Sequence, residues 1–224
     1  MDGGTGASGR TGSAERADWH DWHSAYADQG SSLSKRLRIV QREIARWLDE
    51  RDDPALTVLS LCAGQGHDLL DVLACRPDAG KVRARLVEAD PRNVAAARAR
   101  AARAGAATVD VVQGNAGLLD SYLGWVPADL VLLVGVLGNI PDGDVEGTVR
   151  ALPQLCASGA TVIWTRTRAA PDLTPAVRGW LAETGFAERS FSAPEGELFS
   201  VGVCVFEGAP EPLDPGRRIF RFER

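Results

Sequence analysis

The sequence predicts an α/β protein with a doubly wound, mostly parallel sheet and helices on both faces. Two observations predict this class. Apolar segments of strand length alternate with helix-like segments at a regular interval, and these apolar segments lack the period-two pattern of a half-exposed strand. Strands of this kind are buried on both faces, and the segments between them form right-handed crossovers. The length of 224 residues suits a single core.

The strands follow from these apolar segments. Five parallel strands are predicted at residues 56–61, 82–88, 108–112, 129–134 and 160–164. Two further strand candidates, at residues 187–192 and 199–206, are separated only by a short loop that contains Pro and Gly. They should therefore pair antiparallel, as a hairpin that ends the sheet.

Two of the helices have recognisable starts. Ser31 or Ser32 can cap a helix that ends near residues 52–54. One face of this helix is apolar and carries Leu33, Leu37, Val40, Ile44, Trp47 and Leu48. Asp90 followed by Pro91 is the pattern of an N-cap and a first helical residue, so a second helix should begin there.

The chain divides into three parts by composition. Residues 1–17 are rich in Gly, Ser and Thr, and we expect a disordered arm because they bury too little apolar surface to offset the entropy of ordering. Residues 18–54 form an N-terminal helical segment that begins with aromatic residues, among them Trp19 and Trp22, at helical spacing. Residues 55–224 form the core domain.

Composition also limits the classes of partner and site. The formal net charge of −5 provides no overall attraction for a phosphate backbone, which argues against nucleic acid. The four cysteines form no C-x-x-C pair and no zinc-like spacing, so no metal site is expected. No apolar run is long enough to span a bilayer, and no leader is recognised. These observations predict a cytoplasmic protein with reduced thiols and no membrane contact.

The stretch 62-CAGQGHD-68 connects the first strand to the next helix. Gly64 and Gly66 can adopt conformations that other residues avoid and let a ligand approach the backbone closely. Leu69 stands where the dinucleotide fingerprint requires its third glycine, so hydride-transfer cofactors are disfavoured. The sequence also lacks a phosphate-binding P-loop and a G-x-S-x-G nucleophile motif.

Over residues 55–206 the chain resembles the class I S-adenosylmethionine-dependent methyltransferases, which have a Rossmann-like, seven-stranded fold. The match to the first motif of that family is 60-SLCAGQG-66, in which Ser60 replaces an acid and Cys62 replaces the first glycine. The resemblance implies S-adenosylmethionine as the cofactor. It also implies that the loop residues Cys62, Ala63, Gly64, Gly66 and Asp68 hold this cofactor, with Asp68 as the candidate partner for its ammonium group.

The resemblance implies further cofactor contacts at the ends of the next strands. Glu88 ends the second strand, where the family has an acid that accepts hydrogen bonds from both ribose hydroxyls, and Ala89 follows it. Asn115 and Ala116 follow the third strand, where the family receives the adenine amino group. Gly135 follows the fourth strand, which in the family ends beside the transferable methyl group.

The catalytic candidates are His20, His23, Tyr26 and Asn139. The first three belong to the aromatic segment, which in related enzymes folds over the cofactor; a histidine there suits proton removal near neutral pH. In the alternative interpretation the aromatic residues pack on the sheet and both histidines face water. We expect His67, the third histidine, to be a surface or capping residue.

Asn139 begins the sequence 139-NIPD-142, which partly resembles the N-x-P-aromatic motif of methyltransferases that act on nucleic acid bases. Asp142 occupies the aromatic position, so a loop that leads into the next helix is the preferred interpretation. Arg166 and Arg168 follow the fifth strand, where they either bind a substrate anion or lie in a solvated loop.

The sequence therefore predicts an S-adenosylmethionine-dependent methyltransferase that transfers a methyl group to a small-molecule acceptor. Two alternatives remain open at this point: a nucleic acid base amino-methyltransferase, and a degenerate cofactor-binding scaffold without catalysis. The identity of the acceptor and the oligomeric state do not follow from the sequence.

Overall fold

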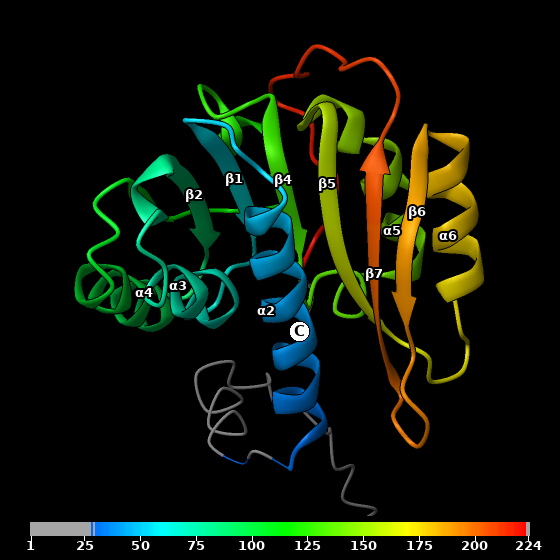
Figure 1. Ribbon diagram of the computed structural model, residues 1–224. Coiled ribbons are helices and arrows are strands. Elements are labelled where there is room, and N and C mark those ends of the chain that lie inside the picture. Colours follow the sequence, from blue (N-terminus) through cyan, green and yellow to red (C-terminus); the bar gives the residue numbers. More distant parts are fainter. Residues whose placement is uncertain (1–27, 29, 223–224) are drawn as a thin grey trace, which may run out of the picture.

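The computed structural model describes residue 28 and residues 30–222, which form a seven-stranded sheet in the order β3-β2-β1-β4-β5-β7-β6 (Figure 1). The strands are β1 (Leu56–Leu61), β2 (Val82–Glu88), β3 (Val109–Gln113), β4 (Ala128–Leu133), β5 (Cys156–Thr167), β6 (Phe186–Ser192) and β7 (Phe199–Phe206). β1 to β5 pair in parallel, whereas β7 runs antiparallel to both β5 and β6. The predicted fold class, five parallel strands and a terminal antiparallel hairpin, is confirmed. The predicted arm at residues 1–17 lies outside the described residues.

The fifth strand differs most from its prediction. It extends from Cys156 to Thr167, well beyond the apolar run at residues 160–164. Its first residues are small and carry no apolar pattern, but Cys156 pairs with Ala128 of β4, and the register shifts between Ala128 and Leu130. Pairing with a neighbouring strand, rather than local sequence, therefore sets the start of β5.

The helices are α2 (Ser32–Asp49), α3 (His67–Leu73), α4 (Pro91–Arg103), α5 (Asp142–Arg150) and α6 (Thr174–Glu183). Two predicted caps are present. The Ser31 hydroxyl accepts a hydrogen bond from the Ser34 backbone N–H at 3.1 Å, and the Asp90 carboxylate accepts one from the Arg92 N–H at 2.8 Å. α2 ends at Asp49, a few residues before the predicted position.

Helices cover both faces of the sheet. α2, α3 and α4 bury their apolar residues against one face, and α5 and α6 bury theirs against the other. Val40 and Ile44 of α2 are fully buried beside residues of β1, β2 and α3. Although α2 belongs to the segment predicted at residues 18–54, it is therefore a packed part of the core.

A C-terminal strap, residues 207–222, follows β7 and returns along the face that α5 and α6 cover (Figure 1, red). The connection from β3 to β4 contains only a short 3-10 turn, Leu119–Tyr122, and the strap pairs beside it. Leu119 N–H donates to the Arg217 carbonyl at 3.1 Å, and Ile219 N–H donates to the Gly117 carbonyl at 2.8 Å. Ile219 and Phe220 are buried in the core cluster on this face. The strap thus adds Ile219 and Phe220 to the core on this face of the sheet, beside the β3–β4 connection, which has only a short 3-10 turn.

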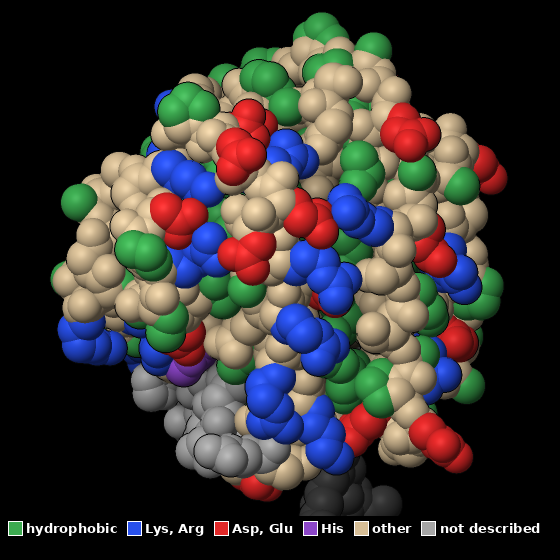
Figure 2. All heavy atoms as spheres, viewed as in Figure 1, with side chains coloured by type: hydrophobic (Ala, Val, Ile, Leu, Met, Phe, Trp, Pro, Cys, Tyr) green, Lys and Arg blue, Asp and Glu red, His purple; other side chains and the backbone are tan. Residues whose placement is uncertain are grey.

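On the face shown in Figure 2, Lys and Arg side chains gather over α2, with acidic side chains among and beside them. Lys35 pairs with Glu197 at 2.6 Å, and Arg46 pairs with Glu43 at 3.3 Å. These ion pairs interrupt the positive field along the helix. Within residues 28 and 30–222, no helix has the length and apolar character needed to cross a bilayer.

Candidate functional site

A cavity of about 1160 Å³ lies at the carboxyl ends of β1, β2 and β4. Its wall is built from the glycine-containing loop after β1, the end of β2, the loops after β3 and β4, the first half of α2 and the end of the strap. β1 lies between β2 and β4, so this is the point at which the strand order reverses. Ligands of open α/β sheets bind at this point.

Cys62 has the backbone conformation of a glycine. Its φ is +51°, in the left-handed region that favours glycine, and Gly64 and Gly66 have φ of +55° and +72°. The loop therefore keeps the shape that the first glycine of the motif would give it. Burial and the nearby Glu88 carboxylate raise the pKa of the Cys62 thiol well above its usual range.

Gly66 differs from its neighbours because it does not line the cavity. It is the N-cap of α3, and a Cβ at this position would lie 2.6 Å from Leu70 Cδ1 and 3.2 Å from Leu86 Cδ2. Gly66 therefore allows α3 to pack closely against β2. The position that a side chain of residue 66 would occupy faces the core and not the cavity.

Glu88 is hydrogen-bonded to the loop after β1 and to the start of α4. One carboxylate oxygen accepts from the Gly64 N–H at 2.8 Å, and the other accepts from the Asp90 N–H at 2.9 Å. Glu88 lines the cavity and remains partly exposed. Each carboxylate oxygen has a second lone pair, so two acceptor positions remain for a ligand.

Asp68 presents a buried carboxylate to the same cavity. The residue is 7% exposed, and one of its oxygens accepts from the Leu69 N–H at 2.8 Å. Among the described residues no lysine or arginine pairs with it. Burial raises the pKa of the Asp68 carboxyl, with the backbone hydrogen bonds and the charge of His67 opposing this effect. A cationic ligand group would compensate for this burial.

Asn115 and Ala116 lie in the cavity wall after β3. The Asn115 amide oxygen accepts from the Gly117 N–H at 2.9 Å, so the atom expected to meet an adenine amino group already closes a turn. This oxygen retains one lone pair. Gly117 itself contacts the strap, because a Cβ on it would lie 2.2 Å from the Phe220 carbonyl oxygen.

Gly135 and Asn139 form a closed turn after β4. The Asn139 Nδ2 donates to the Gly135 carbonyl at 2.7 Å, and the Gly135 N–H donates to the Thr165 hydroxyl at 2.8 Å. Gly135 has φ of +74°, and a Cβ there would lie 3.9 Å from an Arg36 guanidinium nitrogen. The turn thus brings a backbone segment and an amide group to the cavity beside Arg36 of α2.

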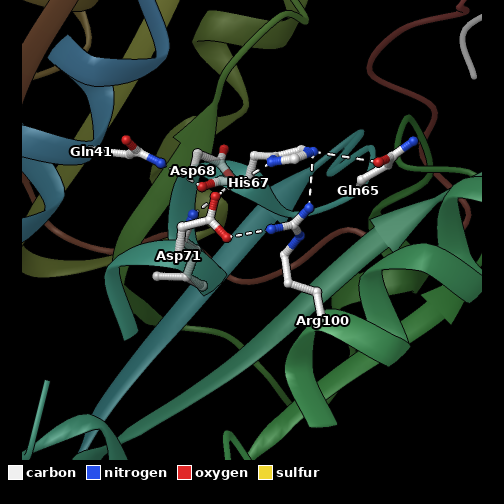
Figure 3. Close-up of polar contacts among 7 residues, drawn as sticks. Gln41, Gln65, His67, Asp68, Asp71 and Arg100 are labelled. Atoms are coloured by element: carbon white, nitrogen blue, oxygen red, sulfur yellow. Dashed lines mark hydrogen bonds and ion pairs between the residues drawn. The ribbon is translucent and has the colours of Figure 1, made fainter. Parts of the chain in front are cut away.

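His67 belongs to a polar network between α3 and α4 (Figure 3). Arg100 Nη2 lies 3.2 Å from His67 Nε2, and Asp71 Oδ2 lies 3.4 Å from His67 Nδ1. The Arg100 guanidinium, a donor, thus lies beside Nε2, and the Asp71 carboxylate, an acceptor, lies beside Nδ1. Gly66, not His67, is the N-cap of α3, so the predicted capping role is wrong, whereas 18% of the His67 side chain is exposed at the cavity wall.

Arg166 lies near the end of β5 and Arg168 directly after it, and neither lines the cavity, so the predicted anion site gains no support from them. Arg166 is 6% exposed; its guanidinium donates to the Leu137 carbonyl and pairs with Asp142 at 2.8 Å. Arg168 donates to the Glu197 carbonyl at 2.8 Å. Arg166 therefore holds the loop after β4 and does not face an anion site.

The structure brings most of the sequence-predicted site residues to one cavity. Its wall includes Cys62, Ala63, Gly64, Asp68, Glu88, Ala89, Asn115, Ala116, Gly135 and Asn139. His20, His23 and Tyr26 lie outside the described residues. Among residues 28 and 30–222, no cluster of three or more His, Cys, Asp or Glu side chains is arranged to hold a metal ion.

Sequence reasoning missed two parts of the wall. Arg36 and Leu37 come from the first half of α2 and are partly buried, and in the sequence a basic residue such as Arg36 resembles any solvated helical residue. Arg218, Phe220, Arg221 and Phe222 come from the strap. The alternation of basic and aromatic residues in 217-RRIFRF-222 is the only sequence signal for this second contribution.

Comparison with known proteins supports the fold. No protein-family model matches the chain, and no curated protein matches it in sequence. Magnesium protoporphyrin IX methyltransferase from Synechocystis PCC 6803, crystallised with bound S-adenosylmethionine, superposes with a TM-score of 0.65 at 16% identity, over 85% of this chain and 92% of that chain. An O-methyltransferase family protein from Burkholderia thailandensis gives 0.65 at 17% identity, over 86% of this chain and 60% of that chain.

A third similar structure is the CurJ carbon methyltransferase, with a TM-score of 0.64 at 14% identity, over 83% of this chain and 58% of that chain. The chain thus spans only about three fifths of the second and third proteins. All three similar structures are methyltransferases, and the strand order here, with its antiparallel terminal pair, agrees with that of their family. This protein has the fold of the class I S-adenosylmethionine-dependent methyltransferases.

Proposed function

We propose that this protein is an S-adenosylmethionine-dependent methyltransferase that acts on a small-molecule acceptor. One observation carries the proposal: two carboxylates, Glu88 and Asp68, line the same cavity at the switch point of a methyltransferase fold. Glu88 offers two acceptor positions and Asp68 offers a buried negative charge. These are the groups that a ribose and an amino acid ammonium require.

Glu88 is our candidate for the ribose contact. Its oxygens are already oriented by the N–H groups of Gly64 and Asp90, so the remaining lone pairs have fixed directions. A carboxylate has no hydrogen to donate, and it can accept from both hydroxyls of a ribose at once. A neutral amide at this position would place a donor against one of the two backbone N–H groups.

Asp68 is our candidate for the ammonium contact. A buried carboxylate without a cationic partner destabilises the folded protein unless a ligand supplies the charge. This explains how the chain can do without the acid that Ser60 replaces. Ser60 is 1% exposed within β1 and does not line the cavity.

The cofactor, when bound, supplies an activated methyl group, so the protein has only to align the acceptor and exclude water. Asn139 cannot accept a proton, and we propose that its amide orients the acceptor. Proton removal, where the acceptor needs it, is assigned to His20 or His23, and Tyr26 is a further candidate. This assignment remains a proposal, because these residues lie outside the described part of the chain.

The size of the cavity supports a second, smaller molecule beside the cofactor. Pockets for single drug-sized ligands typically measure about 300–1,000 Å³, and this cavity measures about 1160 Å³. All four cysteines are free thiols, which supports a reducing, cytoplasmic location. The nucleic acid base alternative gains no support from Asp142, because this residue replaces the stacking aromatic and pairs with Arg166.

Titration calorimetry with S-adenosylmethionine and S-adenosylhomocysteine tests the proposal, with NAD as a control ligand of similar polarity. We expect micromolar binding of the first two ligands and no heat with NAD. Thermal unfolding in the presence of each ligand provides an independent readout. If neither sulfur-containing ligand produces heat or raises the Tm, the scaffold interpretation replaces catalysis.

A further inference from the structure

The wall of the cavity carries two arginines that no described residue neutralises. Arg218 and Arg221 both line the cavity, both are exposed, and neither guanidinium has a hydrogen bond or ion pair within residues 28 and 30–222. The other two arginines of the wall differ, because Arg92 pairs with Asp90 at 2.8 Å and Arg36 is not without a partner either. The strap therefore contributes two positive charges that the described part of the chain does not compensate.

The carboxylates of the wall are already committed to other groups. Glu88 accepts from two backbone N–H groups, and Asp90 caps α4 while it pairs with Arg92. Asp68 is assigned to a cofactor ammonium in the proposed function. The chain as a whole has a formal net charge of −5, so an excess of arginine in the wall of this cavity runs against the overall composition.

The strap holds these arginines on a fixed backbone. The Arg221 N–H donates to the Asp144 carboxylate at 2.9 Å, and the Thr148 hydroxyl donates to the Ile219 carbonyl at 3.0 Å. Leu118 and Arg218 form an antiparallel bridge. Ligand binding thus orders only two side chains and no backbone, which reduces its entropic cost.

Aromatic side chains alternate with the arginines. Phe220 is 2% exposed and Phe222 is 38% exposed, and both line the cavity. Apolar rings next to guanidinium groups suit a ligand with an apolar body and an anionic end, because guanidinium binds carboxylate and phosphate through paired N–H donors.

We propose that Arg218 and Arg221 bind a carboxylate or phosphate group of the methyl acceptor, and that Phe222 contacts its apolar body. Only the identification of this ligand as the methyl acceptor rests on the proposed function. Binding of an aromatic anion beside the strap can be measured whether or not the protein transfers methyl groups.

The test uses three probes with one ring each: benzoate, phenyl phosphate and the neutral benzyl alcohol. Each is titrated by calorimetry into the full chain, with and without saturating S-adenosylhomocysteine. We expect both anions to bind at least tenfold more tightly than benzyl alcohol, and to weaken as salt is raised. The anion that binds with the higher affinity shows whether the site prefers a carboxylate or a phosphate group.

Arg218→Gln and Arg221→Gln should each weaken anion binding about tenfold and leave the benzyl alcohol titration unchanged. Arg217→Gln is the matched control, since Arg217 lies in the same strap but outside the cavity wall. Circular dichroism and Tm of each variant confirm that the fold is intact.

Three results would overturn the inference: equal affinity for anions and benzyl alcohol, no binding of either anion, or an equal effect of Arg217→Gln. A failure of the proposed function can be distinguished from a failure of this inference, because it appears as an absence of S-adenosylhomocysteine binding. In that case the anion titrations without the nucleoside still decide the role of the strap.

Discussion

The carboxylate of Glu88 accepts a hydrogen bond from the backbone N–H of Gly64 at 2.8 Å, which joins the end of β2 to the loop after β1. This contact fixes the direction of the lone pairs that we assign to the ribose hydroxyls. Glu88→Ala removes these acceptors, and hydrogen bonds to charged groups contribute about 1.5–3 kcal/mol. We expect S-adenosylhomocysteine affinity to fall roughly 10- to 100-fold by calorimetry.

Glu146→Ala is the control for this change, since Glu146 is an acidic residue of α5 outside the cavity wall. Its cofactor affinity should equal that of the native protein. Glu88→Gln should be intermediate, because it keeps the shape but introduces a donor. Native affinity in Glu88→Ala would exclude Glu88 as the ribose contact.

Asp68→Asn should stabilise the ligand-free protein and weaken cofactor binding. Burial raises the pKa of Asp68 above its unfolded value, so its contribution to stability is fully present at acidic pH and is lost as pH rises through the folded pKa. The Tm advantage of Asp68→Asn should therefore be larger at pH 7 than at pH 4. Each kcal/mol recovered corresponds to about 2–4 °C in Tm for a protein of this size.

The same variant should bind S-adenosylhomocysteine at least about tenfold more weakly at pH 7, because it lacks the charge that faces the ammonium group. Thermal unfolding with and without ligand measures both effects on one sample. A variant that is less stable than the native protein, or that binds as tightly, would show that Asp68 has another role.

Cys62 is held at φ of +51°, a conformation that costs most residues about 1–2 kcal/mol. Cys62→Gly removes this strain but adds about 0.5–1 kcal/mol of unfolded-state entropy, so the free energy of unfolding should change little. Cys62→Val should be clearly destabilising, because a β-branched side chain tolerates positive φ poorly. Urea unfolding distinguishes the two variants, and equal stability would mean that residue 62 relaxes out of this conformation.

Gly66 and Gly105 offer a matched pair for the packing of α3. Both have positive φ, but a Cβ on Gly66 would lie 2.6 Å from Leu70 Cδ1, whereas a Cβ on Gly105 would meet no atom within 4 Å. Gly105→Ala should therefore lose only the strain term of about 1–2 kcal/mol. Gly66→Ala should lose about 1–3 kcal/mol more from overpacking. Chemical denaturation compares them, and similar losses would show that α3 can shift to make room.

The strands and the polar positions of the cofactor-side wall could be predicted because local sequence determines them. Apolar runs without alternation mark strands buried on both faces, and the polar residues that end them must gather at one edge of a parallel sheet. Among these residues, the resemblance to the methyltransferases singles out Glu88 and Asn115 as cofactor contacts. The sequence places Gly66 at the ligand as well, because spacing alone does not reveal which glycine faces the cavity and which faces Leu70.

The remaining parts of the site depend on contacts between distant segments. The position of Arg166 is set by the loop around Leu137 and Asp142, so its burial cannot be read from the residues beside it. The same holds for the strap, whose place beside Gly117 follows from hydrogen bonds across about a hundred residues of sequence. Neither the burial of Arg166 nor the position of the strap is marked by a hydrophobic periodicity in the local sequence.

The cavity is enclosed by α2 on one face of the sheet and by the strap on the other. During synthesis, a nascent chain that has not yet emerged as far as residue 222 can form β1, β2 and the glycine loop but not the wall beside Gly117. Ligand therefore cannot rescue early folding intermediates, and its protection against proteolysis should develop only after residue 222 has left the ribosome.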